Sequence, residues 1–247
     1  MQLIALLLTA AVALGCAPPL ELEFPERNGD IISLDEPQTI EGEVDMNYKE
    51  YDRGRPCNTD EDLKSNEAVF ILEDGAILSN VIIGSDQLEG IHCKGACTLI
   101  NVWFRDVCED AVSMLGKGDV FVEGGGANAA IDKVFQHNGR GTVTIKDFTI
   151  TNAGTVYRGC GNCTNNGGPR SVIFIGLRAH NVTDALAGIN VNYGDTATIF
   201  DSCGSDINNI CQEWKGVNKS EGIPSARLDS KGSCLGEQGK LDELPTC

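Results

Sequence analysis

The sequence predicts an all-β protein with a single domain, folded as a parallel β-helix, and three observations lead to that fold class. A short β-rich phrase recurs along the chain, Gly, Asn and Asp punctuate the phrases, and no helical heptad competes with them. A recurring period of this size is typical of stacked arrays. Runs of Val, Ile, Thr and Phe favour strands over helices, so the array should be built of strands.

The phrase occurs six times. The first two copies are residues 76–83 and 97–104, in which Asn80 and Asn101 fall at the same place. The copies are spaced 21 to 29 residues apart, and the later ones cover residues 120–123, 143–148, 172–177 and 197–201. Irregular spacing suits a parallel β-helix, because its loops vary in length while its strands stack about 4.8 Å apart. A leucine-rich repeat is disfavoured, since its leucine framework is absent.

The N-terminus has the pattern of a signal peptide over residues 1–17. Leu3 to Leu14 form an apolar run too short to span a bilayer, and the small residues Gly15, Cys16 and Ala17 follow it. Residues 18–247 are then expected to form the β-helix domain. Because no other segment is apolar enough to cross a membrane, we expect a secreted, extracellular protein with no membrane partner.

Ten cysteines remain after Ala17, which indicates an oxidising compartment and disulfide bonds of open connectivity. Cys160 and Cys163 form a single CxxC, which predicts a disulfide rather than a zinc site. Residues 21–74 differ from the repeats and are expected to cover the first coil, as open solenoid ends need capping. The polar C-terminal region is expected to be a disulfide-pinned cover containing Cys203, Cys211, Cys234 and Cys247.

The net charge of −17 is concentrated near the N-terminus. Residues 20–74 carry 17 acidic and 5 basic residues, so they account for −12 of it. No basic face dominates, which argues against nucleic acid as a partner.

Three acidic residues recur through the repeats at spacings of 21 and 22, namely Glu89, Asp110 and Asp132. If the coils stack, these carboxylates form a ladder about 5 Å apart, and they either spread into solvent or hold a hard cation. Calcium suits several oxygen ligands, and Glu109 beside Asp110 offers another. Solvated turn acids remain an equal alternative for the three acids alone.

Two basic residues accompany this ladder. Lys133 follows Asp132 directly, and Arg158 lies 25 residues further on, about one coil away. Calcium flanked by Lys and Arg is an arrangement suited to a substrate that carries carboxylates. Asp132 is expected chiefly to position Lys133.

Several motifs resemble polysaccharide lyase family 3, the small secreted microbial pectate lyases, from about Phe24 to Cys234. They are Tyr51-Asp52-Arg53-Gly54, Leu72-Glu73-Asp74-Gly75-Ala76, Glu89-Gly90-Ile91-His92-Cys93, Val107-Cys108-Glu109-Asp110-Ala111, Asp132-Lys133-Val134-Phe135-Gln136-His137-Asn138-Gly139 and Arg158-Gly159-Cys160-Gly161-Asn162-Cys163.

The resemblance implies a monomeric enzyme on a right-handed parallel β-helix with loop-rich, disulfide-stabilised ends. It also implies calcium-dependent cleavage of polygalacturonate or pectin by β-elimination, in plant cell wall degradation. By position, Glu89, Glu109 and Asp110 match the family's calcium ligands, and Lys133 and Arg158 match its catalytic basic residues. We expect Lys133 to be the base and Arg158 to bind the substrate carboxylate, although the two roles could be exchanged.

Two positions depart from the family pattern. Many members have lysine and serine where this chain has Thr155 and Gly159. The loss of a cation leaves open a catalytically weakened pectin-binding or elicitor-like protein, or a preference for partly esterified pectin. A hydrolase on the same architecture is a further alternative, but the paired-Asp and Gly-His-Gly signatures of polygalacturonases are missing.

Overall fold

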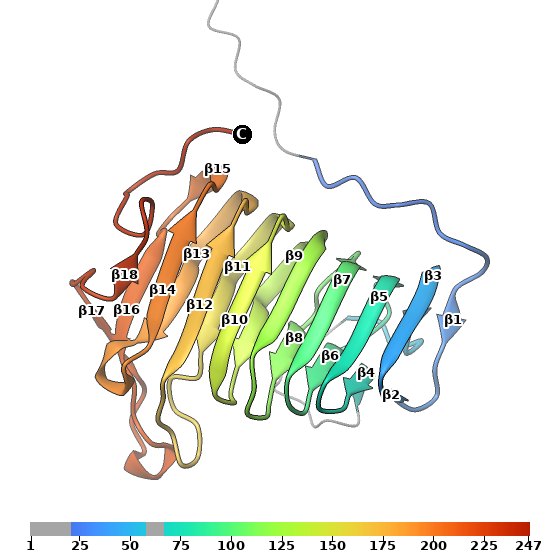
Figure 1. The fold of residues 1–247 in the computed structure, drawn as a ribbon, viewed down its shortest axis with the longest axis horizontal. Coiled ribbons are helices and arrows are strands. Elements are labelled where there is room, and N and C mark those ends of the chain that lie inside the picture. The colour runs from blue at the N-terminus through green and yellow to red at the C-terminus, as the bar shows by residue number, and fades with distance from the viewer. Residues whose placement is uncertain (1–20, 58–66) are drawn as a thin grey trace, which may run out of the picture.

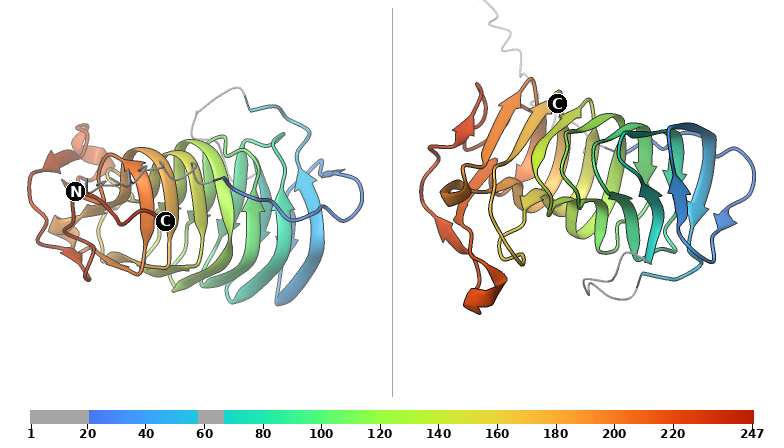
Figure 2. Two further views of the ribbon diagram at one scale, coloured as in Figure 1. Left: turned by 90° about the horizontal axis from the view of Figure 1, so that it is seen from above. Right: turned by 60° about the horizontal axis from the view of Figure 1, so that its bottom comes forward.

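The computed structural model describes residues 21–57 and 67–247, which form a right-handed parallel β-helix. The strands lie side by side from β3 to β18 (Figure 1). Seen from above, successive coils of the chain stack along one axis, from the N-terminal coil to the C-terminal coil (Figure 2). The expected signal peptide, residues 1–17, lies outside the described residues. Among the described residues, no helix is both long and apolar enough to cross a membrane.

The six predicted phrases form one face of the β-helix. Their first residues, Ala76, Cys97, Val120, Val143, Val172 and Ala197, pair in succession in parallel register. The repeat prediction is therefore confirmed at the level of individual residues. The strands that carry the phrases are β5 (Ala76–Ile83), β7 (Cys97–Phe104), β9 (Val120–His137), β10 (Gly141–Lys146), β12 (Arg170–Ile175) and β14 (Thr196–Phe200).

Two further faces complete each coil. The second face joins the later parts of β3 (Glu43–Asp52), β5 and β7 to the middle of β9. It continues through the starts of β11 (Thr149–Gly159) and β13 (Arg178–Asn190) and ends at β15 (Cys203–Ile207). The third face carries the site described below. It runs through β2 (Gln38–Ile40), β4 (Ala68–Leu72), β6 (Glu89–Cys93), β8 (Asp110–Met114), the ends of β9, β11 and β13, and β16 (Cys211–Lys215).

In the core, side chains at equivalent positions of successive strands stack in columns. One column contains Leu78, Leu99, Val122, Ile145, Phe174 and Ile199, and each of these side chains is buried. Alternate residues point outward, as a strand requires, which leaves Phe121 about half exposed at 52%. Since burying each large apolar side chain contributes roughly 1.5–3 kcal/mol, the column both stabilises the stack and fixes its register.

Asparagines at one corner allow the chain to turn between faces. Asn80 and Asn101 have φ of 50° and 51°, in the left-handed region that Asn tolerates. The Asn101 amide donates to Asn80 Oδ1 at 3.1 Å, so the corner is also hydrogen-bonded from coil to coil. At the next coil Gly124 takes this place, and a Cβ there would lie 2.5 Å from Asn101 Oδ1.

Five disulfides pair all ten cysteines that follow residue 17: Cys57–Cys108, Cys93–Cys97, Cys160–Cys163, Cys203–Cys247 and Cys211–Cys234. The predicted CxxC disulfide and the predicted disulfide-pinned C-terminal cover are confirmed.

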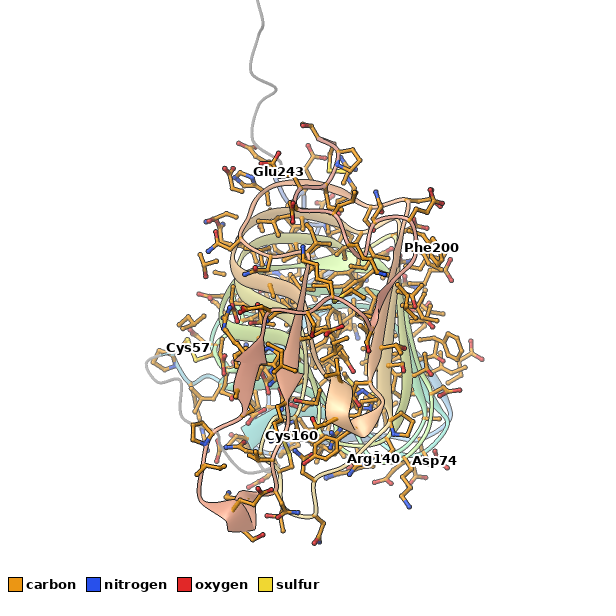
Figure 3. The ribbon with its side chains drawn as sticks, turned by 90° about the vertical axis from the view of Figure 1, so that its left-hand side faces the viewer. Cys57, Asp74, Arg140, Cys160, Phe200 and Glu243 are labelled. Atoms are coloured by element: carbon orange, nitrogen blue, oxygen red, sulfur yellow. A yellow bond between two sulfur atoms is a disulfide. The ribbon has the colours of Figure 1, made fainter. Side chains whose placement is uncertain are left out.

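The N-terminal segment does more than cover the first coil, because it forms that coil. β2 pairs with β4, β3 pairs with β5, and the short β1 (Ile32–Ser33) pairs with β3. At the other end, β17 (Ala226–Leu228) pairs antiparallel with β16, and β18 (Cys234–Leu235) pairs with β14. Figure 3 looks at the molecule from this C-terminal end, with Phe200 and Cys57 on opposite sides of the coil. Within the described ranges, η2 (Val191–Tyr193) and η3 (Lys219–Glu221) are short 3-10 helices.

Candidate active site

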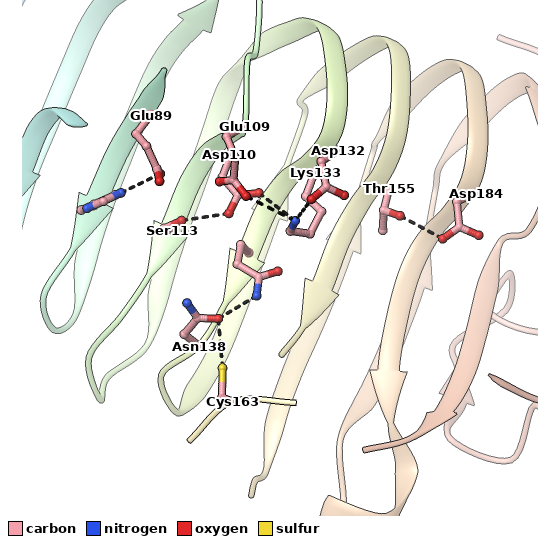
Figure 4. Close-up of polar contacts among 12 residues, drawn as sticks. Glu89, Glu109, Asp110, Ser113, Asp132, Lys133, Asn138, Thr155, Cys163 and Asp184 are labelled. Carbon is pink, nitrogen blue, oxygen red and sulfur yellow. Dashed lines mark hydrogen bonds and ion pairs between the residues drawn. The ribbon is translucent and has the colours of Figure 1, made fainter. Parts of the chain in front are cut away.

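A groove of about 540 Å³ lies on the third face of the β-helix. Its walls include Glu89, Glu109, Asp110, Asp132 and Lys133, which come from neighbouring coils (Figure 4). All three acids of the predicted ladder therefore reach one groove, together with the predicted lysine. Farther along the strands the groove is bordered by Asn138, Asn162 and Lys219.

The strand register corrects one detail of the predicted ladder. Asp110 pairs with Lys133, not with Asp132. The strand position that an acid occupies in one coil is therefore occupied by a base in the next. The reason lies in the core, where Ile91, Val112 and Phe135 stack in register and are fully buried. A slip by one residue would turn Phe135 toward solvent, so the packing decides the register. Asp132 instead occupies the position that Glu109 holds one coil earlier.

The three carboxylates that lie closest together are not the three that recur at spacings of 21 and 22. Glu109, Asp110 and Asp132 each offer an oxygen within 4.8 Å of the others. Glu89 lies in the same groove, but its carboxylate is hydrogen-bonded to His92 Nε2 at 2.9 Å. Asp132 was expected chiefly to position Lys133, and it also belongs to the carboxylate cluster itself. The structure places Glu89 at the edge of the cluster.

Burial leaves this acidic cluster short of compensating charge. Glu109 and Asp110 are only 5% and 4% exposed. Burial, together with the Asp110 carboxylate, raises the pKa of Glu109 to about 9, and burial raises the pKa of Asp110 to about 6. Asp110 Oδ2 accepts a hydrogen bond from Ser113, whereas no donor among the described residues is hydrogen-bonded to the buried Oδ1. The cluster is thus suited to receive a cation.

Lys133 provides the positive charge nearest to the cluster. Its Nζ lies 3.4 Å from Asp110 Oδ1 and 3.8 Å from Glu109 Oε1, and it also pairs closely with Asp132. Burial alone would lower the pKa of Lys133, but the three carboxylates outweigh it and raise that pKa. Three carboxylates thus surround the ammonium group of Lys133.

Arg158 lies on β11, next to the part of β9 that carries Lys133, but farther along the strand. It pairs in register with Gln136, three residues beyond Lys133, which corresponds to roughly 10 Å along a strand. Its guanidinium donates to the carbonyl of Gly188 at 3.3 Å and to Asn190 Oδ1 at 3.2 Å. Burial lowers the pKa of Arg158 to about 10. These contacts hold the guanidinium firmly in one position.

The two departures from the family pattern have local explanations in the packing. Thr155, next to Lys133 in register, is buried and donates a hydrogen bond to Asp184 Oδ2 at 3.1 Å. At Gly159, a Cβ would lie 3.1 Å from Asp195 Oδ2 and 3.3 Å from Asn190 Nδ2. Those two side chains are hydrogen-bonded to each other, so glycine at 159 leaves room for the pair.

Sequence reasoning misses three residues that lie around Arg158. Trp214 lies under the Arg158 guanidinium, whose central carbon is 4.6 Å from the ring centroid. Ser225 accepts from Arg158 at 3.3 Å, and Arg227 contacts Trp214 as well. No repeat signal marks these residues, since Trp214 lies on β16, outside the six phrases, and Ser225 and Arg227 belong to the irregular C-terminal region.

Comparisons with known proteins agree with this fold. Residues 21–221 match the family model described as pectate lyase. Among related sequences, "Probable pectate lyase E" of Neosartorya fischeri is 44% identical and covers 91% of each chain. "Pectate lyase H" of Emericella nidulans is 48% identical, covering 83% of this chain and 80% of its own.

Solved structures give the same answer. The catalytic domain of pectate lyase PelI from Erwinia chrysanthemi superimposes with a TM-score of 0.71 at 29% identity, covering 85% of this chain and 98% of that domain. PelI in complex with tetragalacturonic acid has a TM-score of 0.67 at 30% identity, covering 81% of this chain and 67% of PelI. The β-helix and its groove thus define an enzyme of the polysaccharide-cleaving class. The chain belongs to the pectate lyase family.

Proposed function

We propose that this pectate lyase is calcium-dependent and cleaves polygalacturonate or pectin by β-elimination, releasing unsaturated oligogalacturonates from plant cell walls. The observation that carries the proposal is the groove in which Lys133 lies among Glu109, Asp110 and Asp132. The similarity to PelI, which binds tetragalacturonic acid, supports the same class of substrate.

The residues present fit a calcium ion. Calcium prefers oxygen ligands, and the cluster offers carboxylate oxygens from Glu109, Asp110 and Asp132, with Glu89 beside them. Asp110 Oδ1 accepts no hydrogen bond from the described residues, and the pKa of Glu109 is raised, so both groups indicate that further positive charge would relieve repulsion in the cluster. Calcium, when bound, would neutralise a galacturonate carboxylate and so acidify the proton at the adjacent C5.

Lys133 and Arg158 then perform the elimination. Lys133 in its neutral form takes the C5 proton, the C5–H electron pair forms the C4–C5 double bond, and the C4–O electron pair leaves with the glycosidic oxygen, which takes a proton from water. A cation held by Glu109, Asp110 and Asp132 would offset the carboxylates that raise the pKa of Lys133. Arg158 binds the carboxylate through its fork of N–H donors and stabilises the charge that develops on it. Lysine suits the role of base better than arginine, because a guanidinium is very hard to deprotonate. An exchange of the two roles remains the alternative.

The decisive experiment follows the ultraviolet absorbance of unsaturated ends on polygalacturonate, with calcium or with a chelator. Calcium-dependent absorbance is expected for the wild-type protein. Lys133→Ala should lower turnover by a factor of about 10² to 10⁴, the usual contribution of a general base, with a near-normal melting temperature in calcium. Near-normal turnover in that variant would remove Lys133 from the mechanism, and reducing ends without absorbance would indicate hydrolysis.

A second candidate function is a weakened pectin-binding or elicitor-like protein. The observation that favours it is Thr155, which is engaged with Asp184 and supplies no charge beside Lys133. Retained binding of polygalacturonate without product would support this alternative. In either case we propose a secreted monomer from which residues 1–17 are removed, and the five disulfides suit that extracellular route.

A further inference from the structure

The C-terminal arm, defined here as residues 216–228, borders the groove beyond Arg158. Lys219 of this arm lines the groove, and Ser225 accepts a hydrogen bond from Arg158. Arg227 reaches back to Trp214, with its guanidinium carbon 4.8 Å from the ring centroid. Trp214 therefore contacts two guanidinium groups, from Arg158 and Arg227, and brings them to one place.

Arg227 also continues the row of side chains that begins at the acidic cluster. Thr155 is the register neighbour of Lys133, and its hydroxyl donates to Asp184 (Figure 4). Asp184 in turn forms an ion pair with Arg227. Because adjacent strands lie about 4.8 Å apart, Asp184 stands two strand spacings, or roughly 10 Å, from the backbone of Lys133. Arg227 thus lies beyond Asp184, on the side of the later coils.

The Arg227 guanidinium keeps donors available. Its side chain is 48% exposed, and it donates to Asp184 and, at 3.4 Å, to Gln212 Oε1. An arginine has five N–H donors, so several remain for a ligand. The contacts to Asp184, Gln212 and Trp214 reduce the freedom of a long side chain, which lowers the entropy lost on binding.

Negative and positive side chains lie on different coils of this face. Acidic residues lie on the coils before Lys133, where a cation fits, and Arg158 and Arg227 lie on the side of the later coils. A polyanion bound across the coils would therefore meet positive charge on both sides of Lys133, with a cation at the cluster on one side and the arginines on the other.

We propose that Arg227 is a substrate-binding residue, whose guanidinium binds the carboxylate of a galacturonate unit next to the unit held by Lys133 and Arg158. Asp184 and Trp214 are positioning residues for it. This inference rests on the proposed function and adds to it a specificity for unesterified neighbours of the cleaved bond, because a methyl ester offers no charge to the guanidinium.

The test compares Arg227→Gln with the matched control Lys231→Gln. Lys231 lies in the same C-terminal region, is 38% exposed, and is likewise ion-paired, with Asp242 at 2.9 Å. Arg227→Gln is expected to raise KM on polygalacturonate about tenfold, the effect of losing one charged hydrogen-bonding partner, and to change KM on highly methyl-esterified pectin much less. Arg227→Lys should restore only part of the affinity, since lysine lacks the planar fork. Lys231→Gln should leave both values unchanged.

A binding measurement keeps the test independent of turnover. Tryptophan fluorescence reports on Trp214 together with Trp103, the other tryptophan of the chain. Trigalacturonate can therefore be titrated into the wild-type protein and into Arg227→Gln, with melting temperatures confirming that both are folded. A weaker dissociation constant for Arg227→Gln supports the proposal. The proposal is overturned by a KM and a dissociation constant within twofold of wild type, or by equal rises in KM on both polymers. A wild-type protein that forms no unsaturated ends would instead count against β-elimination, and the titration would still decide the role of Arg227.

Discussion

His137 should make the protein lose stability as the pH falls from about 6.5 toward 3. Its ring is buried at the end of β9 and is hydrogen-bonded through Nδ1 to Tyr157 Oη at 2.9 Å. Burial, with smaller contributions from the charges of Arg170 and Arg140, lowers the pKa of His137 from 6.5 to about 3. The unfolded chain therefore binds a proton at mildly acidic pH that the folded protein excludes.

The size of the effect follows from these two pKa values. Each pH unit between them changes the free energy of unfolding by about 1.4 kcal/mol, so stability attributable to His137 falls by roughly 3 kcal/mol between pH 7 and pH 4. The raised pKa values of Glu109 and Asp110 act in the opposite direction, since protonation of these two carboxylates stabilises the folded protein. A comparison of variants removes that background.

The assay is urea unfolding of the wild type and of His137→Gln at several pH values from 7 to 4. Glutamine can keep a hydrogen bond to Tyr157 but does not titrate. The free energy of unfolding of His137→Gln should therefore fall by about 3 kcal/mol less than that of the wild type over this range. His180→Gln, at a histidine paired on the surface with Ser205, serves as the control. Parallel stability curves for wild type and His137→Gln, or an NMR titration of the His137 ring near pH 6.5, would refute the reasoning.

Two further predictions concern the groove. Asp110→Asn removes a charged ligand oxygen from the buried cluster, so calorimetry should show calcium affinity lowered about tenfold or more; unchanged affinity would place the ion elsewhere. Thr155→Lys introduces an ammonium group beside Asp184 and in register with Lys133, so KM on polygalacturonate should fall. If neither activity nor affinity rises in that variant, the threonine does not limit the enzyme.

The strands of the first face were predictable because their pattern is local. In each phrase, alternate residues are apolar, and the same side chains that define the phrase fill the core. The six phrase starts consequently pair in register from Ala76 to Ala197. The corner formed by Asn80 and Asn101 follows the same repeat, and the prediction that they share one position is confirmed.

The acidic ladder shows where a local pattern stops being sufficient. The similar spacings of 21 and 22 residues suggest that Asp110 stacks on Asp132. The register step from Val112 to Phe135 is 23 residues, two more than the step from Ile91 to Val112, so Lys133 takes the paired position. Packing of Phe135 on Val112 decides between these registers, and that packing is not visible in the spacing of the charged residues. The assignments of Glu89, Glu109, Asp110, Lys133 and Arg158 to calcium binding and catalysis stay predictions.

The residue pattern alone was enough to predict the stacked β-helix, the need for disulfides and the coils on which the acids and Lys133 lie, because strand periodicity and residue chemistry are properties of neighbouring positions. The folded chain was needed to show which cysteines pair, which carboxylates meet, and that Trp214 contacts both Arg158 and Arg227. These contacts join segments far apart in the chain, and the irregular C-terminal path that creates them follows no repeat. Distant contacts of this kind depend on how the whole chain packs, which no local pattern encodes.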